Sequence, residues 1–390
     1  MLAPTSFFAD YGCHVRILEE AVELRRMGHE VKICTYHIGR DVAGVSIART
    51  TKIPWRKGQE VGSSHYKIAL DMLLSYTSLS VAWRWRPDVI HAHLHEGALI
   101  GYPVSLLCRV PLIFDFQGSL TSEMIDHGFL RVDSPFYPFM LHLERRINRL
   151  PGAIIVSSRH AYDLLRTAFG VGDDKMHIVP DCVNADTFAP YGTQAEKLRM
   201  KRRFGIPEDH KVIVYLGLLA EHQGTSLLIR ALAHLLTTQS KVHAVIMGYP
   251  WVEHYQAMAE ELGIAKEITF TGQIPYSEAR QFLAVGDIAV SAKISATEGQ
   301  GKLSTYMAMA IPTVTFDTPV AREYLDEDGI FATLGDPLSL AEGIAFALDN
   351  PEQAARIGSS LRERAINRFS WEAAGRKIVQ IYDTCCRDLN

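Results

Sequence analysis

The stretch HVRILEEAVELRRMGHEVKICTY (14–36) contains a helical pattern that ends at Gly28 and is followed at once by a short β-rich run. Apolar residues recur at helical spacing over 14–28, and a glycine directly after such a pattern is a typical stop signal. The run EVKICTY (30–36) has the length and composition of a strand. A helix that leads straight into a strand is part of a β–α–β unit, so this stretch indicates an α/β protein.

The same alternation continues along nearly the whole chain. Most candidate strands are apolar on both faces, as expected where helices cover both sides of a parallel sheet. Besides 30–36 the candidates are DVIHA (88–92), PLIFDF (111–116), AIIVSS (153–158), HIVP (177–180), KVIVYLG (211–217), VHAVIMG (242–248), EITFTG (267–272), DIAVSA (287–292) and PTVTFD (312–317). Repeated units of this kind predict doubly wound parallel sheets with right-handed crossovers.

Ten buried strands are too many for a single sheet of this kind. The alternation of strands and helices also breaks over 186–211, which is rich in Pro, Gly and charged residues. We therefore place a linker near residue 190. The sequence predicts two Rossmann-like domains, 1–190 and 191–370, that face each other across a cleft. Ligands in such sheets bind beyond the carboxyl ends of the strands, so the loops at those ends are the candidate site.

Composition and charge exclude several classes of protein. The 390 residues are 47% hydrophobic and 22% charged, which is typical of a globular chain and not of a disordered one. The formal net charge of −4 gives no basic excess, so we expect no nucleic-acid partner. The six cysteines show no CxxC spacing and read as reduced thiols. No signal peptide and no apolar stretch of about 18 residues is visible, so a soluble, cytoplasmic protein is expected.

The loop KISATEGQGK (293–302) follows a buried strand and opens a helix, LSTYMAMA (303–310). Gly299 and Gly301 would allow a ligand close to the backbone, and the helix N-terminus offers free N–H groups to an anion. Lys302 adds a positive charge, so the loop is a candidate phosphate site, with Glu298 placed to accept hydrogen bonds from sugar hydroxyls. The alternative is an ordinary glycine-rich turn with solvated charges.

Two other segments carry weaker signals. Gly12, in the loop FFADYGCH (7–14), could admit a diphosphate, but the dinucleotide fingerprint GxGxxG is absent, which removes the best support for hydride transfer. HAHLHE (91–96) would place His91, His93 and His95 on one face of a strand, although we expect the strand to end after Ala92. No Asp or Cys is spaced to complete a metal site, so one imidazole is expected in the core and the others at the cleft.

The stretch SYTSLSVAWRWRPD (75–88) interleaves two tryptophans with two arginines. Such a helix end could lie on an anionic membrane surface with its rings at headgroup depth. Alternatively, Trp83 and Trp85 pack inward while Arg84 and Arg86 are solvated. The second interpretation is favoured, because two charges are few for stable attachment.

Six segments in order along nearly the full chain resemble the GT-B glycosyltransferases, in particular glycosyltransferase family 4. They are MLAPTSFFADYGCHVRILEEAVELRRMGHEVKICT (1–35), PDVIHAH (87–93), IVPDCVNADTFAP (178–190), VIVYLGLLAEHQGTSLLIRAL (212–232), EGQGKLSTYMAMAIPTVTFD (298–317) and FSWEAAGRKIVQIYD (369–383). The strand that should precede MLAP is short, and we expect the natural first strand to begin upstream of Met1. The last segment resembles the family's closing helix, so 371–390 is expected to pack back onto the first domain.

The resemblance implies transfer of a sugar from a nucleotide-diphosphate donor, with retention of anomeric configuration and no obligatory metal. The donor would lie in the second domain and the acceptor, a glycan, a lipid-linked glycan or a small molecule, mostly in the first. Any membrane contact would be peripheral, at the inner face. The residues assigned are Glu298, Lys302 and Gln117 to catalysis, Gly12, Gly217, Gly299, Gly301, Thr305 and Tyr306 to the donor, and His93, His95 and Asp115 to the acceptor side. Further acceptor contacts are expected from the loops 50–65 and 117–135.

The sequence departs from the family pattern at four of its site positions. Leu218 and Gln223 stand where an Arg and a Lys usually meet the diphosphate, Thr305 stands for the second Glu of the acidic pair, and Gln117 for the cleft His. Lys302 is expected to replace the missing cations. The alternative is a catalytically silent GT-B partner subunit that lost them. A sugar-nucleotide epimerase or a glycoside phosphorylase is less favoured, because those enzymes would keep strong phosphate-binding cations.

Overall fold

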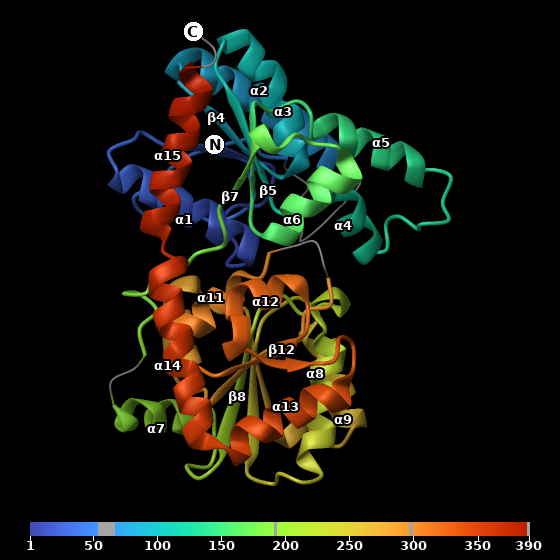
Figure 1. Ribbon diagram of the computed structural model, residues 1–390, viewed down its shortest axis with the longest axis vertical. Helices are drawn as coiled ribbons and strands as arrows, with labels where there is room; N and C mark the ends of the chain where they lie inside the picture. Colours follow the sequence, from blue (N-terminus) through green and yellow to red (C-terminus); the bar gives the residue numbers. More distant parts are fainter. Residues whose placement is uncertain (54–66, 191–192, 296–298, 388–390) are drawn as a thin grey trace.

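The computed structural model of the chain describes residues 1–53, 67–190, 193–295 and 299–387. Two α/β units are stacked along its long axis, and each is built on one parallel sheet (Figure 1). The first sheet has the strand order β3-β2-β1-β4-β5-β6-β7 and the second β10-β9-β8-β11-β12-β13. The prediction of two Rossmann-like, doubly wound domains is confirmed.

The strands of the first sheet are β1 (Leu2–Ala3), β2 (Lys32–Thr35), β3 (Ser46–Arg49), β4 (Ile90–His93), β5 (Leu112–Phe116), β6 (Ala153–Val156) and β7 (Met176–Ile178). Its helices are α1 (Gly12–Arg26), α2 (Lys67–Trp85), α3 (Leu94–Cys108), α4 (Leu120–Asp126), α5 (Tyr137–Ile147) and α6 (Arg159–Leu164). Every residue of β4, β5 and β6 is buried. Helices on both faces account for this burial, as the two-sided apolar pattern predicted.

The strands of the second sheet are β8 (Lys211–Leu216), β9 (Val242–Met247), β10 (Ile268–Gly272), β11 (Ile288–Ser291), β12 (Thr313–Phe316) and β13 (Ile330–Ala332). Its helices are α7 (Gln194–Arg203), α8 (Thr225–Leu236), α9 (Val252–Glu261), α10 (Ala279–Leu283), α11 (Gly301–Ala308), α12 (Pro319–Leu325), α13 (Pro337–Asp349) and α14 (Pro351–Arg368). Two strands were not predicted, β3 and β13. Both lie at sheet edges and are only four and three residues long, so they lack the apolar run of a central strand.

The last helix, α15 (Trp371–Arg387), leaves the second unit and lies against α1 of the first (Figure 1). Gly375 allows this approach, because a Cβ there would lie 2.6 Å from the side chain of Glu23. The hydroxyl of Tyr382 lies 2.6 Å from Nδ1 of His91. The chain therefore passes between the units twice, after β7 and after α14.

Two expectations about side chains were wrong. Trp83 does not pack inward, since its ring is 78% exposed on α2, whereas Trp85 is half-buried beneath Lys32. The strand was expected to end after Ala92, whereas β4 continues through His93, whose side chain stays in the sheet, and turns directly into α3. The sequence pattern indicated the helix that carries Trp83 but not which of its sides faces the core, and it did not predict α3.

Candidate active site

A cavity of about 290 Å³ lies between the carboxyl ends of the two sheets. The first unit contributes residues that follow β1, β4 and β5, and the second unit contributes residues that follow β8, β9 and β11. The lining residues include Gly12, Arg16, Lys67, Gln117 and Asp181 from one side and Gly217, Gly248, Lys293, Gly299, Gly301, Lys302 and Thr305 from the other. This is the place where open α/β sheets bind ligands.

The wall from the second unit is built around the N-terminus of α11. The helix begins at Gly301, and Nζ of Lys302 lies 3.2 Å from Oε1 of Gln223 and 3.3 Å from the hydroxyl of Tyr215. The ammonium group also lies over the Tyr215 ring, 4.5 Å from its centroid. Gly217 leaves room for it, because a Cβ there would lie 2.7 Å from Nζ. A cation, the N-terminus of a helix and a glycine thus meet at one corner of the cavity.

A second lysine at this corner escaped the sequence interpretation. Lys293 follows β11 directly, is only 3% exposed, and donates a hydrogen bond of 2.8 Å from Nζ to the carbonyl oxygen of Gly299. This bond fixes the backbone of the turn at Gly299, and the Lys293 side chain also lines the cavity. The feature of the sequence that could have identified Lys293 as a site residue is its position directly after a buried strand.

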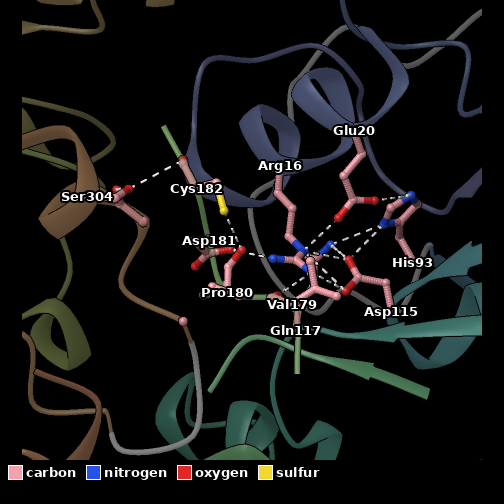
Figure 2. Close-up of polar contacts among 12 residues, drawn as sticks. Arg16, Glu20, His93, Asp115, Gln117, Val179, Pro180, Asp181, Cys182 and Ser304 are labelled. Atoms are coloured by element: carbon pink, nitrogen blue, oxygen red, sulfur yellow. Dashed lines mark hydrogen bonds and ion pairs between the residues drawn. The ribbon is translucent and has the colours of Figure 1, made fainter. Parts of the chain in front are cut away.

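The wall from the first unit is organised by Arg16, which points from α1 into a group of carboxylates (Figure 2). Its guanidinium donates to Asp115 at 2.8–3.1 Å and to Asp181 at 2.9 Å. Gln117 donates from Nε2 to the same Asp115 carboxylate at 2.8 Å. Burial alone would raise the pKa of Asp115, but the Arg16 guanidinium and the hydrogen bond with His93 outweigh it and hold that pKa well below its usual range.

Asp181 connects the two walls. It lies in the segment between β7 and β8, and Gly299 approaches it so closely that a Cβ on the glycine would lie 2.3 Å from Oδ2. Its backbone N–H donates to the hydroxyl of Tyr324 on α12 of the second unit, at 2.8 Å. Arg16 and Asp181 together therefore tie α1 to the glycine turn. Neither residue was singled out from the sequence, because their partners are far away along the chain.

The structure brings seven of the predicted site residues to the cavity: Gly12, Gln117, Gly217, Gly299, Gly301, Lys302 and Thr305. Leu218 and Gln223, which stand where the family usually has an Arg and a Lys, also line the cavity. Glu298 lies outside the described residues, as does most of the loop 50–65. From the loop 117–135, Glu123 and His127 join Gln117 at the cavity.

Tyr306 is a correction. Its side chain is completely buried, and its hydroxyl accepts a hydrogen bond of 2.7 Å from the backbone N–H of Leu216. It is a core residue that joins α11 to the end of β8 and does not line the cavity. Thr305 and Tyr306 are neighbours on a helix, so only one of them can point toward the cavity.

His93, His95 and Asp115 also lie elsewhere than expected. All three side chains are buried behind the cavity wall rather than exposed on it. His95 packs edge-on against Phe114 and Phe116, 5.1 and 5.3 Å between ring centroids, and its Nε2 lies 3.5 Å from Glu144. Parallel pairing of β4 with β5 sets His93 beside Asp115, whose carboxylate supports Gln117 from behind.

The expectation that no carboxylate accompanies the histidine motif was wrong. Glu20 of α1 and Asp115 of β5 join His91 and His93, with one potential ligand atom from each residue lying within 4.8 Å of all the others. Glu20 and His91 are 71 positions apart, so spacing in the sequence could not reveal the group. Burial and the nearby Asp115 raise the pKa of Glu20, against the opposing effect of Arg16.

Within the described residues, no helix is both long enough and apolar enough to cross a membrane.

Two family models match this chain, one for each unit. The Glycosyl transferase 4-like domain matches residues 11–182, and Glycosyl transferases group 1 matches residues 196–364. The chain is a GT-B glycosyltransferase of the family 4 type. The predicted enzyme class, a glycosyltransferase, is thereby confirmed, and the silent-partner alternative is not favoured.

Relatives of this glycosyltransferase agree with the assignment. It is 25% identical to a D-inositol 3-phosphate glycosyltransferase of Corynebacterium glutamicum, over 97% of this chain and 93% of the relative. It is 28% identical to a GDP-mannose-dependent alpha-(1-6)-phosphatidylinositol monomannoside mannosyltransferase of Mycolicibacterium smegmatis, over 61% of this chain and 63% of that one. Sugar transfer is therefore its chemistry.

Solved structures show the same fold at low identity. The sucrose-phosphate synthase of Thermosynechococcus elongatus superposes with a TM-score of 0.84 at 16% identity, covering 99% of this glycosyltransferase and 98% of that chain. Anabaena HepE in complex with UDP-glucose superposes with a TM-score of 0.76 at 16% identity, covering 98% of both chains. These likenesses establish the two-domain GT-B architecture.

Proposed function

We propose that this glycosyltransferase moves a sugar from a nucleotide-diphosphate sugar to a hydroxyl acceptor with retention of anomeric configuration. The observation that carries the proposal is the corner of the interdomain cavity where Lys302, the N-terminus of α11 and the glycines at 217, 299 and 301 meet. The leaving nucleotide diphosphate gains negative charge during transfer, and this corner presents a cation and backbone N–H groups to it.

Lys302 and Lys293 would act in different ways. Lys302 reaches the cavity with its ammonium group and would bind a phosphate oxygen, replacing the cations that are missing at Leu218 and Gln223. Lys293 bonds to the carbonyl oxygen of Gly299 and would keep the turn in the shape that exposes its N–H groups. Charge stabilisation by these groups needs no metal ion at the diphosphate, and we propose none there.

The sugar and the acceptor would occupy the rest of the cavity. We assign Glu298 to the hydroxyls of the donor sugar, from its position directly before the glycine turn. Gln117 is held in place by the hydrogen bond that its Nε2 donates to Asp115, and its carbonyl oxygen would accept a hydrogen bond from an acceptor or sugar hydroxyl. Positioning of this kind lowers the barrier because the reacting groups need not be brought together from solution.

The named relatives suggest the classes of donor and acceptor. HepE binds UDP-glucose, and the Mycolicibacterium relative uses GDP-mannose and acts on a phosphatidylinositol mannoside. We propose a UDP- or GDP-sugar as donor and a glycan, lipid-linked glycan or small polyol as acceptor. None of the six cysteines is in a disulfide, which supports a cytoplasmic site of action.

Peripheral contact with the inner face of a membrane is part of this proposal. Five exposed apolar side chains of α2 lie at spacings of three and four residues, namely Ile68, Met72, Tyr76, Leu79 and Trp83. Residues at such spacings share one face of a helix. Arg84 and Arg86 are exposed at the end of the same helix, where they would meet anionic headgroups.

The experiment is a panel of UDP-, GDP- and ADP-sugars tested for thermal stabilisation and for slow hydrolysis without acceptor. A donor at about 100 times its dissociation constant adds about 2.7 kcal/mol to the free energy of unfolding, which is readily visible as a shift of Tm. We expect one donor to stand out and to be hydrolysed to a sugar of unchanged anomeric configuration, as followed by NMR. If no sugar nucleotide binds or reacts, the proposed donor is wrong, and inverted product would overturn the retaining mechanism alone.

A further inference from the structure

Behind the wall of the active-site cavity lies a buried group of Glu20, His91 and His93, together with Asp115. Glu20 comes from α1, the two histidines from β4 and Asp115 from β5. Their exposed fractions are 1%, 2%, 0% and 0%. The two imidazole rings are stacked with their centroids 4.6 Å apart, so both present the same edge to the Glu20 carboxylate.

Hydrogen bonds settle which ring nitrogen faces that carboxylate. Nδ1 of His93 lies 3.0 Å from Asp115, and Nδ1 of His91 lies 2.6 Å from the hydroxyl of Tyr382. The remaining nitrogens, Nε2 of His91 and of His93, lie 3.7 and 4.0 Å from Oε2 of Glu20. These distances are too long for hydrogen bonds. Neither Nε2 atom nor either oxygen of Glu20 has a hydrogen-bond partner among the described residues.

The charges around this gap do not balance. Arg16 contributes one positive charge, and Glu20, Asp115 and Asp181, all within ion-pair distance of it, contribute three negative ones. With neutral imidazoles and all three carboxylates ionised, the group carries a net charge of −2 in a place without solvent. Buried charge without compensation is costly, and unpaired buried nitrogen and oxygen atoms add to that cost.

We propose that Glu20, His91 and His93 bind one divalent transition-metal ion, Zn²⁺ by the chemistry of its donors, through one carboxylate oxygen and two Nε2 atoms. Zinc bonds of about 2.0–2.2 Å in tetrahedral geometry place neighbouring ligand atoms roughly 3.4 Å apart, a few tenths of an ångström closer than the 3.7 and 4.0 Å measured here. The ion would bring the net charge to zero and give a ligand bond to Oε2 of Glu20 and to both Nε2 atoms, while Oε1 of Glu20 keeps its ion pair with Arg16.

The surroundings have the features of a zinc site's outer shell. Ligating histidines usually donate their other N–H to a carboxylate or similar acceptor, as His93 can to Asp115 and His91 to Tyr382. The ligating carboxylate is itself paired, because Nε of Arg16 lies 3.1 Å from Oε1 of Glu20. The site would join α1 to β4 and, through Tyr382, to α15. It lies apart from the diphosphate corner, so it stabilises the first unit and takes no part in sugar transfer.

The test is made on the full-length protein, because a buried ion would be loaded during folding. The chain is unfolded in denaturant with a chelator, freed of both, and refolded with or without Zn²⁺; bound zinc is then measured by mass spectrometry after gel filtration. We expect about one ion per chain and a higher Tm for the zinc-refolded sample. Refolding with Co²⁺ should give the visible absorption of a cobalt ion held by nitrogen and oxygen ligands in a low-symmetry site.

Two variants and a control locate the site. Glu20→Gln and His91→Gln should lower zinc affinity at least about tenfold and abolish the cobalt absorption. His243→Gln is the matched control, a buried histidine of β9 that is bonded to Thr269 in the other unit, and it should keep one ion. A wild-type chain that binds no zinc and has the same Tm with and without it overturns the proposal, whether or not the variants fold. Equal zinc loss in the control would also overturn the assignment of these ligands.

Discussion

At the level of single residues, two glycines are needed because other side chains come very close to them. A Cβ on Gly217 would lie 2.7 Å from Nζ of Lys302, and a Cβ on Gly299 would lie 2.3 Å from Oδ2 of Asp181. The glycines therefore let a cation and a carboxylate approach the backbone of the donor corner. The geometry that we propose for diphosphate binding depends on these two contacts.

Lys302→Ala should weaken binding of the nucleoside diphosphate by about 1.5–3 kcal/mol, the range for a hydrogen bond to a charged group. The ammonium group is the cation that the structure places at the N-terminus of α11. Binding of the corresponding nucleoside, which lacks phosphates, should hardly change. Isothermal titration calorimetry measures both affinities. Lys266→Ala, at an exposed lysine of the same unit, is the control, and unchanged diphosphate affinity in Lys302→Ala would contradict the phosphate role.

His14→Gln should flatten the pH dependence of stability below neutrality. Nδ1 of His14 accepts a hydrogen bond of 2.8 Å from the backbone N–H of Ala9, and Nε2 lies 2.5 Å from Thr5. Burial lowers the pKa of His14 from 6.5 to about 3, so the unfolded chain binds a proton between these values and the folded chain does not. Stability is thus lost as the pH falls below 6.5, by about 1.4 kcal/mol at pH 5.5.

The measurement is urea unfolding at pH 7.5 and pH 5.5 for wild type and variant. The difference between the two pH values should be smaller in His14→Gln by about 1.4 kcal/mol. His254→Gln, at an exposed histidine of α9, should leave the difference as in wild type. An unchanged difference in His14→Gln would mean that this imidazole does not stay neutral in the folded protein.

At the level of elements, α2 and α15 each carry apolar side chains on one face, but among the described residues only the face of α15 is covered by another helix. Both run along the surface of the first unit, and α15 buries its apolar face against α1. The five exposed side chains of α2 named above, from Ile68 to Trp83, are not covered by another helix in the part of the chain that the structure describes, while Leu70, Leu74 and Ala82 are buried and the helix packs on α3. An apolar face of this length without a covering element indicates a partner surface.

Trp83→Asp should weaken binding to vesicles that contain anionic lipid by at least about tenfold, because a buried aromatic ring contributes roughly 1.5–3 kcal/mol. Flotation of the protein with vesicles of neutral and of mixed anionic composition measures the effect. Leu262→Asp, at an exposed leucine of the second unit, is the matched control. If wild type does not float with anionic vesicles, or if both variants lose binding equally, α2 is not the membrane contact.

At the level of the whole molecule, the two units are joined by two chain passages and by polar contacts across the cavity. Asp10 accepts a hydrogen bond of 2.7 Å from the backbone N–H of Tyr276, and the Tyr276 hydroxyl donates to Glu19 at 3.0 Å. Arg159 bonds through its backbone N–H to Glu323. We predict relative motion of the two domains, with hinges near residue 190 and near 370.

Donor binding should close the cavity and shrink the molecule. Ligand contacts with both walls would favour the closed form, and closure would exclude water from the transfer reaction. Small-angle scattering with and without saturating donor measures the radius of gyration, which we expect to fall. Lys302→Ala at the same donor concentration should stay nearer the unliganded value. Identical scattering of wild type in both conditions would contradict closure driven by the donor.

The sequence by itself determined the fold class, the division into two sheets and the glycine-rich loop 293–302. Hydrophobic period and glycine position are local properties, and they identified the loop 293–302 with Gly299 and Lys302, both of which line the cavity. Gly217, which also lines it, was assigned from the family resemblance. The family motifs along the chain added the chemistry. Each of these patterns is formed by residues that are close together in the chain, so it can be recognised in a single sequence.

Only the tertiary structure decided which side chains meet. Arg16 bonds to Asp115 across 99 positions, and the group of Glu20, His91 and His93 forms because α1 lies over the end of β4. Rotation of a helix about its axis turned Tyr306 inward and Trp83 outward, although their helices were both predicted. Such placements depend on how elements pack against each other, and a pattern along the chain does not encode that geometry residue by residue.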